Sequence, residues 1–236
     1  MTDYTGIDNL EVMREAKNYN AYLHSIIDAQ IRPQDKVVDF GAGSGTFAIP
    51  LVRRGVDIVC VEQDPQLKEI LREADTPVVS SLDEISMASV DFVYSLNVLE
   101  HIDDHREALS ALAERLKNGG RLLLYVPAFP ILFSAMDRKV GHHRRYRRGQ
   151  LMSLLDEAGF RVRDAIYVDS LGFVLTIAYR IAGSDTGDIN RTALKIYDRF
   201  FFKFSRLLDR GLQHWIGKNL LVLAEKARET FAISEQ

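Results

Sequence analysis

The strongest constraint on the fold is an alternation of short apolar runs with amphipathic stretches from residue 36 onward. The runs KVVDF, VDIVCVE, SVDFVYSLN and RLLLYVP are nearly continuous in apolar residues, as in parallel strands that are buried on both faces. Helical stretches lie between them, because parallel strands need crossover connections. With TPVVSS, RVRDAIYVDS and NLLVLAEKA, these runs predict an α/β fold with a doubly wound, mainly parallel seven-stranded sheet.

Two segments outside this pattern define the expected domain organisation. Residues 9–31 carry apolar side chains at helical spacing before Pro33, which predicts an N-terminal helix. Residues 171–218 show helical periodicity and many aromatics, and a connection of that length in a compact sheet is usually functional. We therefore expect one domain, 1–236, with its core in 35–170 and 219–227 and a helical cap, 171–218, inserted before the last strand.

Composition narrows the functional class. The chain has 236 residues and a net charge of −3, so it lacks the broad positive charge of proteins that coat nucleic acids. Its one cysteine, Cys60, and the spacing of its histidines give no pattern typical of a metal site, so no metal is expected. Without a signal-like leader or an apolar run of bilayer length, we expect a cytoplasmic location and no transmembrane segment.

A glycine-rich turn is the best candidate for a ligand site. VVDFGAGSG places Gly41, Gly43 and Gly45 between a predicted strand and a predicted helix, where residues without Cβ let the backbone approach a ligand. Glu62 follows the second strand, where a carboxylate can accept both hydroxyls of a ribose. A dinucleotide site favours a third glycine where this chain has Thr46.

With Asp39 ahead of the turn, the pattern DxGxGxG resembles class I S-adenosylmethionine-dependent methyltransferases, and the resemblance covers most of the chain. It implies a Rossmann-like fold, S-adenosyl-L-methionine as cofactor and S-adenosyl-L-homocysteine as product. It further implies Glu62 on the ribose, Gln63 beside the adenine and Ser81 where the family often has an aspartate. The implied cofactor contacts are Asp39, Gly41, Ala42, Gly43, Gly45, Glu62, Gln63, Ser81, Leu82, Asn97, Val98 and His101.

A closer resemblance is to a bacterial small-molecule subgroup that begins with a helix bearing EAKNYNAYL and carries a GHHRRYRR-like run after the fifth strand. In that subgroup the first helix covers the cofactor, which implicates Tyr19. Ordinary helix packing is an equally good interpretation of Tyr19.

The run GHHRRYRRGQ, residues 141–150, predicts how the acceptor is held. Arginine's planar fork suits carboxylate and phosphate oxygens, and the run falls at the sheet edge where ligands bind. We expect a small, partly apolar, anionic acceptor, lipid-like or phosphorylated, on His142, His143, Arg144, Arg145 and Tyr146. The alternative is that these arginines pair with acids such as Asp137 or Asp156 and only order the loop.

His101 and His142 are the candidate catalytic bases, because imidazole titrates near neutrality. Positioning alone could also suffice, since the sulfonium is already a strong methyl donor. The segment SLNVLEHI lacks the Asn-Pro-Pro-Tyr type of motif that holds a flipped base, so no nucleic-acid substrate is expected. An NAD(P)-dependent oxidoreductase and a non-catalytic binding protein stay open, as do a homodimer and peripheral membrane contact.

Overall fold

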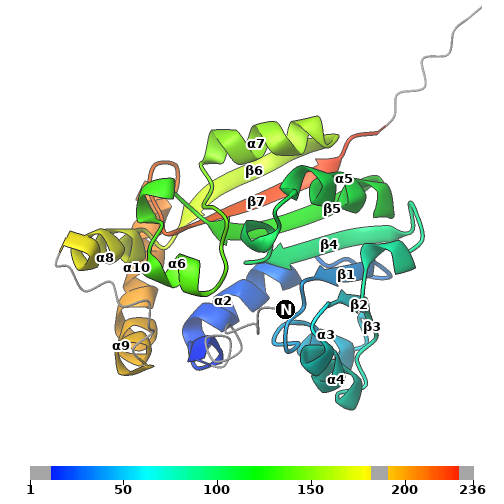
Figure 1. Cartoon of the computed structure of the whole chain (residues 1–236), viewed down its shortest axis with the longest axis horizontal. Coiled ribbons are helices and arrows are strands. Elements are labelled where there is room, and N and C mark those ends of the chain that lie inside the picture. Colours follow the sequence, from blue (N-terminus) through cyan, green and yellow to red (C-terminus); the bar gives the residue numbers. More distant parts are fainter. Residues whose placement is uncertain (1–11, 182–190, 229–236) are drawn as a thin grey trace, which may run out of the picture.

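The computed structural model describes residues 12–181 and 191–228, which are arranged around one twisted sheet (Figure 1). Its seven strands lie in the order β3-β2-β1-β4-β5-β7-β6. They are β1 (Lys36–Phe40), β2 (Asp57–Val61), β3 (Val78–Val79), β4 (Val90–Leu96), β5 (Leu116–Pro127), β6 (Phe160–Val168) and β7 (Asn219–Lys226). Neighbouring strands pair in parallel except β7, which is antiparallel to β5 and β6. The expected doubly wound, mainly parallel sheet of seven strands is confirmed.

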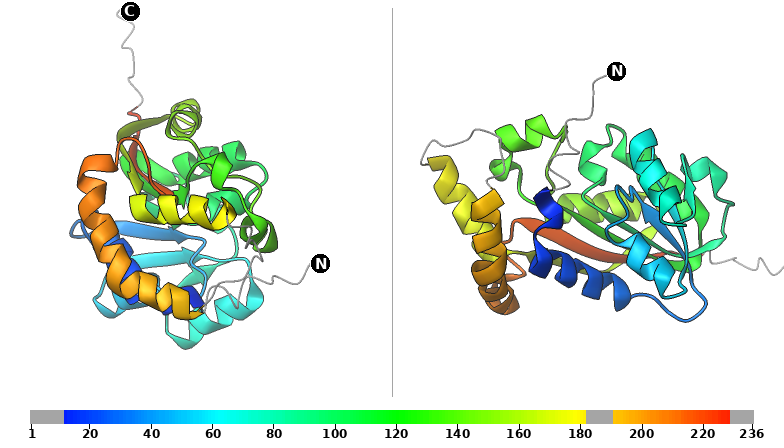
Figure 2. Two further views of the ribbon diagram at one scale, coloured as in Figure 1. Left: turned by 90° about the vertical axis from the view of Figure 1, so that its left-hand side faces the viewer. Right: turned by 90° about the horizontal axis from the view of Figure 1, so that it is seen from below.

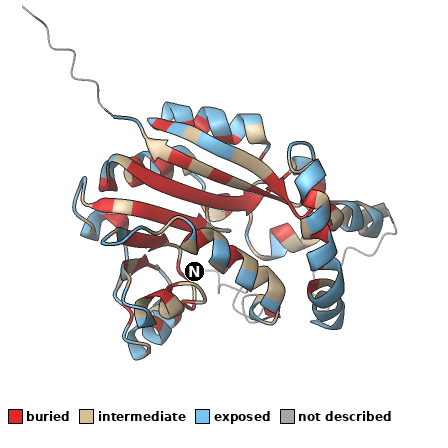
Figure 3. Ribbon diagram, turned by 180° about the vertical axis from the view of Figure 1, so that it is seen from behind, coloured by how far each residue is buried: buried red, intermediate tan, exposed pale blue. Residues whose placement is uncertain are grey.

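Alternate residues of the central strands point into two separate cores. Val38 and Val93 belong to a cluster with leucines of α5 (His105–Arg115) and α7 (Arg148–Glu157) on one face. Their neighbours Val37 and Phe92 belong to a second cluster on the other face. That cluster is covered by α2 (Lys17–Asp28), α3 (Ala48–Arg53) and α4 (Pro65–Glu73). Figure 3 shows the central strands buried between exposed helix surfaces, as a sheet with two apolar faces requires.

The carboxyl ends of most strands lie at one edge of the sheet. Gly41 follows β1, Glu62 follows β2 and Asn97 follows β4. Asn219, the first residue of β7, is paired both with Pro127 at the end of β5 and with Val168 at the end of β6. Asp169, which follows β6, and Lys218, which precedes β7, therefore lie at the same edge. Ligands of doubly wound folds bind at this edge, so these positions define where a site is built.

The N-terminal helix is shorter than the predicted 9–31. Residues 9–11 lie outside the described part, residues 12–14 form a separate helical turn, and α2 begins only at Lys17 and ends at Asp28. Its start is set by Asp198, whose carboxylate accepts from the backbone N–H of Asn18 at 2.9 Å and of Tyr19 at 2.8 Å. Asp198 thus serves as an N-cap from a distant part of the chain, which the local sequence does not reveal.

Between β6 and β7, the described residues form three α-helices and a short π-helix. They are α8 (Ser170–Ile181), α9 (Arg191–Ile196), the π-helix η4 (Tyr197–Phe201) and α10 (Phe202–Leu212). Figures 1 and 2 place them together at one end of the sheet, beside the start of α2. The buried carboxylate of Asp209 ties α10 to β6 by accepting from the backbone N–H of Asp169 at 3.0 Å and of Ser170 at 2.8 Å.

Candidate functional site

The three glycines of the turn after β1 have different surroundings. All three have positive φ, +81° at Gly41, +56° at Gly43 and +76° at Gly45, a backbone region that favours glycine. A Cβ on Gly41 would lie 2.3 Å from Val98, and one on Gly45 would lie 2.7 Å from Ile49 and Leu71. A Cβ on Gly43 would meet nothing within 4 Å. Gly41 and Gly45 therefore serve packing, whereas Gly43 faces open space that a ligand could fill.

Glu62 closes this turn from the end of β2. Its carboxylate accepts from the backbone N–H of Gly43 at 2.7 Å, of Gln63 at 2.8 Å and of Asp64 at 2.9 Å. Three donors hold the two oxygens in place, so Glu62 is oriented in advance for hydroxyl donors on a ligand. Gln63 is exposed next to it, and the buried Ala42 belongs to the core beneath the turn.

Two other expected contacts come from loops at the same edge. Ser81 caps a short 3-10 helix, η1 (Leu82–Glu84), and Leu82 is buried beneath it. Asn97 has φ +55°, donates its N–H to the Tyr125 carbonyl at 2.7 Å and leaves its side chain exposed. The positive φ at a non-glycine residue directly after β4 is a strained conformation of the kind found at ligand sites.

Asp39 lies under the turn and is 3% exposed. The Tyr94 hydroxyl donates to its carboxylate at 2.8 Å. Burial raises the pKa of Asp39 to about 7. The hydrogen bond from Tyr94 lowers this pKa, and the nearby Glu62 carboxylate raises it by a smaller amount.

The raised pKa of Asp39 predicts a pH-dependent cost to folding. In the unfolded chain this carboxyl ionises near its ordinary pKa of about 3.9, so folded-state stability falls as pH rises from about 4 to about 7 and stays low above that. Asp39→Asn keeps an acceptor for Tyr94 and removes the ionisation. Urea unfolding without cofactor measures the free energy of unfolding of both proteins. The difference between Asp39→Asn and wild type should be about 2 kcal/mol larger, in favour of the variant, at pH 8 than at pH 5. A gain that is equal at both pH values would contradict this explanation.

Tyr19 is partly buried and packs against the small apolar cluster of Leu23, Tyr125 and Val168. Its ring makes edge contacts with Tyr125 at a centroid distance of 6.2 Å and with Phe202 at 5.5 Å. Burial raises the pKa of the Tyr19 hydroxyl, with Tyr125 and Asn97 as its polar neighbours. The helix-packing interpretation of Tyr19 therefore has direct support, while its hydroxyl lies on the Asn97 side of the site.

Two residues of the basic run, Arg145 and Tyr146, have structural partners. The Arg145 guanidinium is 8% exposed and binds the Asp137 carboxylate through Nε at 2.9 Å and Nη2 at 2.9 Å. Tyr146 is fully buried and donates its hydroxyl to the Leu99 carbonyl at 3.1 Å. These contacts join the run to Asp137 and Leu99, as the alternative of arginines paired with acids such as Asp137 expects, and the acceptor contacts of both residues stay predictions.

The rest of the run stays near the surface. Arg144 is half-buried and donates to Nδ1 of His105 at 2.7 Å and to the Asp103 carbonyl at 2.9 Å. His143 is exposed, and its backbone N–H donates to the Glu100 carbonyl at 2.8 Å. Arg144 thus remains partly exposed to solvent, although its contacts orient it.

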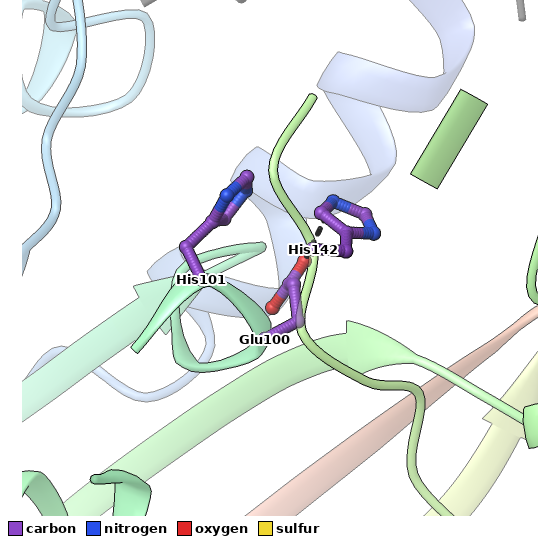
Figure 4. Close-up of side chains that lie close together, drawn as sticks. All are labelled: Glu100, His101 and His142. Atoms are coloured by element: carbon purple, nitrogen blue, oxygen red, sulfur yellow. Dashed lines mark ion pairs between the residues drawn. The ribbon is translucent and has the colours of Figure 1, made fainter. Parts of the chain in front are cut away.

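His101 and His142, the two candidate bases, come together around a third residue that the sequence analysis did not select (Figure 4). Their ring centroids are 4.6 Å apart. Glu100, on the 3-10 helix η2 (Leu99–His101), places its carboxylate beside His142 and is fully buried. Burial lowers the pKa of His101 to about 4 and raises that of Glu100 to about 8.

Asp137 supports this cluster from α6 (Ala135–Lys139). Its carboxylate is bound to Nδ1 of His142 at 2.7 Å, and the backbone N–H of Ser134 donates to it at 2.8 Å. Asp137 is almost fully buried. Acidic residues near the basic run were expected only as charge partners, and nothing in the local sequence signals that Glu100 and Asp137 face the two histidines.

Comparisons with known proteins show the family of this chain. A family described as "Methyltransferase domain" matches residues 8–165. Uncharacterized methyltransferase Rv3342 of Mycobacterium tuberculosis is 32% identical over 136 residues, which are 56% of this chain and 51% of that protein. A mitochondrial ubiquinone biosynthesis O-methyltransferase of Schizosaccharomyces pombe is 30% identical over 119 residues, 46% of this chain and 43% of that protein. The chain thus spans about half the length of these relatives.

Solved structures extend the likeness to the described fold. A Thermotoga maritima structure described as a possible histamine N-methyltransferase has a TM-score of 0.64 at 16% identity and covers 94% of this chain and 96% of its own. Phosphoethanolamine N-methyltransferase 2 of Haemonchus contortus, solved with S-adenosyl-L-methionine, has a TM-score of 0.60 at 18% identity, covering 96% of this chain and 59% of its own. The chain belongs to the methyltransferase-domain family and has the fold of class I S-adenosylmethionine-dependent methyltransferases.

Proposed function

We propose that this protein transfers a methyl group from S-adenosyl-L-methionine to a small, partly apolar acceptor. The observation that carries the proposal is the open space over Gly43, closed on one side by the oriented carboxylate of Glu62. In a methyltransferase-domain chain, this is the place for a nucleoside with a charged amino-acid end. The residues present fit S-adenosyl-L-methionine, because the turn leaves room for close approach and Glu62 offers acceptors to a ribose.

The chain's own residues would bind and orient the two reactants. Glu62 would accept the ribose hydroxyls, and the exposed Gln63 would lie beside the adenine near Ser81 and Leu82. Asn97 would contact the methionine end with its exposed side chain. When bound, S-adenosyl-L-methionine supplies a methyl group on a sulfonium. The residues named above would hold the acceptor atom, whether oxygen, nitrogen or carbon, in line with that methyl group, and such alignment supplies much of the rate.

Calorimetric titration with S-adenosyl-L-homocysteine and with NAD separates the competing functions. We expect saturable binding of one S-adenosyl-L-homocysteine per chain and none of NAD, whereas the reverse would favour an oxidoreductase. Transfer of labelled methyl from S-adenosyl-L-methionine to any member of a panel of phenolic, amine and carboxylate acceptors would exclude a non-catalytic binding protein. Cofactor binding without transfer to any of them would favour the non-catalytic alternative.

Relatives do not fix the acceptor atom, because their names include O- and N-methyltransferases. The anionic part of the acceptor, as we propose it, rests on Arg144. This guanidinium is half-buried, and its partners are a histidine, a backbone carbonyl and the exposed Asp103 carboxylate at 3.5 Å. An acid on the acceptor could displace that last, weak contact.

Arg144→Gln should therefore raise KM for a carboxylate or phosphate acceptor by about tenfold, the effect of one lost charge-assisted contact, and leave kcat and cofactor affinity nearly unchanged. Steady-state kinetics on the best acceptor of the panel tests this. Arg147→Gln is the matched control, since Arg147 is exposed in the same run. Equal KM changes in both variants, or none in Arg144→Gln, would remove the anionic acceptor from the proposal.

We also propose that one face of α9–α10 contacts an anionic membrane surface, from which a lipid-like acceptor would be drawn. Apolar side chains at helical spacing, Ile196, Phe200, Phe204 and Leu207, are between 48% and 63% exposed. Beside them lie the exposed cations Arg199, Lys203 and Arg210, whereas Arg206 is half-buried and its guanidinium is bound to Asp209 at 3.2 Å. The acids of the segment, Asp198 and Asp209, are buried, so the surface is cationic although the whole chain carries a net charge of −3.

This pattern is typical of a helix that lies in a membrane interface. A hollow of about 340 Å³ beside the cations offers room for a headgroup, and its lining combines Lys203, Arg206 and Arg210 with Leu207, Gln213 and the Asp209 carboxylate that Arg206 binds. No helix in the described ranges, 12–181 and 191–228, is long and apolar enough to cross a bilayer. A cytoplasmic location stays a prediction.

Sedimentation with phosphatidylcholine vesicles should show binding only when phosphatidylserine is included. The double variant Phe200→Ser, Phe204→Ser should weaken vesicle binding by at least about tenfold, because apolar burial in the membrane is lost. The double variant Lys203→Glu, Arg210→Glu should weaken it by a similar factor, because electrostatic attraction to the anionic lipid is lost. Met87→Ser is the control, because Met87 is 66% exposed and lies on the loop before β4. A dimer in solution that the phenylalanine pair dissociates, with no vesicle binding, would identify a second copy as the partner. Salt-sensitive binding to generic RNA would likewise contradict a membrane partner.

A further inference from the structure

The side chain of Glu100 is buried without a hydrogen-bond partner. It is 0% exposed, and neither carboxylate oxygen has a partner in the part of the chain that the structure describes. The nearby guanidinium of Arg145 is occupied by Asp137. Leaving a buried acid unpaired costs several kcal/mol, so native proteins usually supply a hydrogen bond, an opposite charge or a metal.

His142 presents one nitrogen to this carboxylate. Its Nδ1 is bound to Asp137 at 2.7 Å, so Nε2 is the nitrogen left for another partner. That Nε2 lies 3.8 Å from Oε1 of Glu100, too far for a hydrogen bond. A carboxylate that holds the second nitrogen of a histidine is the usual support of a metal-ligating imidazole, because it fixes the ring and makes the free nitrogen more basic.

His101 supplies a third ligand atom from the residue next to Glu100. Its ring contacts the backbone of Gly141 and meets the His142 ring edge to face at 4.6 Å. One ligand atom from each of Glu100, His101 and His142 lies within 4.8 Å of the other two. Two ligands of a tetrahedral zinc ion, each about 2.1 Å away, are about 3.4 Å apart, so small side-chain shifts would suffice.

We propose that Glu100, His101 and His142 bind one divalent transition-metal ion of the Zn²⁺ class. Two imidazoles and one carboxylate leave a fourth position for water or substrate, as in catalytic rather than structural zinc sites. The His142 side chain is 15% exposed, which gives an ion a route to the otherwise buried cluster. The sequence predicts no metal because His142 is far along the chain from the Glu100–His101 pair, and only the loop after α6 brings them together.

The position of this site suggests its use, a step that rests on the proposed methyl transfer. Glu100 and His101 follow β4 in the same short segment as Asn97 and Val98, which are expected beside the methionine end of the cofactor. A divalent ion there would bind a hydroxyl of the acceptor and favour loss of its proton to water. The resulting oxygen anion would attack the methyl carbon, with S-adenosyl-L-homocysteine leaving.

Metal binding is measured directly on the tag-free full chain, stripped with a chelator and kept without S-adenosyl-L-methionine. Zn²⁺ is titrated against a chromophoric chelator, and Co²⁺ is used to record the visible bands of a four-coordinate ion. We expect one ion per chain. Glu100→Gln and His142→Gln should each weaken Zn²⁺ binding by about a hundredfold and abolish the Co²⁺ bands. His143→Gln, an exposed neighbour outside the cluster, should change the affinity by less than about twofold.

The outcomes separate this inference from the proposed methyl transfer, because S-adenosyl-L-homocysteine is titrated in parallel. Cofactor binding with no stoichiometric Zn²⁺, or with Zn²⁺ binding that Glu100→Gln and His142→Gln leave unchanged, would overturn the metal site alone. Stoichiometric Zn²⁺ binding without cofactor binding would keep the site and remove its proposed use. Circular dichroism shows whether each variant is folded, and a third substitution, His101→Gln, replaces any that is not.

Discussion

Gly43→Val is expected to remove S-adenosyl-L-homocysteine binding from a chain that still folds. Gly43 has φ +56° and faces open space, so the valine side chain would stand where the cofactor approaches the turn. The loss of affinity should exceed about a hundredfold, or about 2.7 kcal/mol, because both the space and the backbone approach are lost. Calorimetry on the folded variant measures it.

Gly55→Val is a close control. Gly55 has φ +81°, also has nothing within 4 Å of an added Cβ, and lies in the turn between α3 and β2. Both substitutions carry the strain of a branched residue at positive φ, of order 1–2 kcal/mol, and should destabilise the fold to a similar extent. Only Gly43→Val should lose the cofactor. Equal affinity in the two variants would mean that the space over Gly43 is not the cofactor site.

Arg145→Ala is expected to lower the free energy of unfolding by about 3–5 kcal/mol. Arg145 and Asp137 are both buried, and removing one partner leaves an uncompensated charge in the interior. Asp137 keeps its contacts with His142 and Ser134, so the loss should fall short of complete unfolding in a chain of this size.

Urea unfolding of Arg145→Ala, Arg145→Lys and Arg147→Ala tests this role. The lysine variant keeps the charge but not the two-pronged contact, so it should lie between wild type and alanine. Arg147 is exposed, and its loss should change stability by less than about 0.5 kcal/mol. If Arg145→Ala were as stable as wild type and impaired only acceptor use, the original expectation of an acceptor contact would be correct after all.

The sequence predicted the sheet because buried parallel strands must be apolar on both faces. Val37 and Val38 show the principle: adjacent residues enter opposite cores, so no polar residue fits at either position. The glycine turn was predictable for a similar reason, since Gly41 must admit Val98 and no side chain fits there. The apolar strand residues and the positive φ of the glycine turn are requirements of the backbone at each position, so the local sequence shows them even where the contacting residue is distant.

What the sequence did not reveal depends on partners far along the chain. Asp198 caps α2 although 180 residues separate it from Asn18, so the 9–31 helix could not be given its true start. Arg145 and Arg144 look alike in the run, yet only Arg145 meets Asp137. In the sequence, nothing distinguishes Glu100 from an ordinary helix-forming residue. In the structure it is buried beside His142 of the loop after α6. Spacing along the chain carries no information about such pairings.

A crystal structure of the complex with S-adenosyl-L-homocysteine would show directly whether Gly43 and Glu62 form the cofactor site. We expect the ligand at the carboxyl ends of β1, β2 and β4, with both ribose hydroxyls within hydrogen-bond distance of Glu62 and the amino-acid end against Gly43 and Asn97. Density for the ligand anywhere else, or a Glu62 carboxylate that still contacts only the backbone N–H groups of Gly43, Gln63 and Asp64, would contradict it.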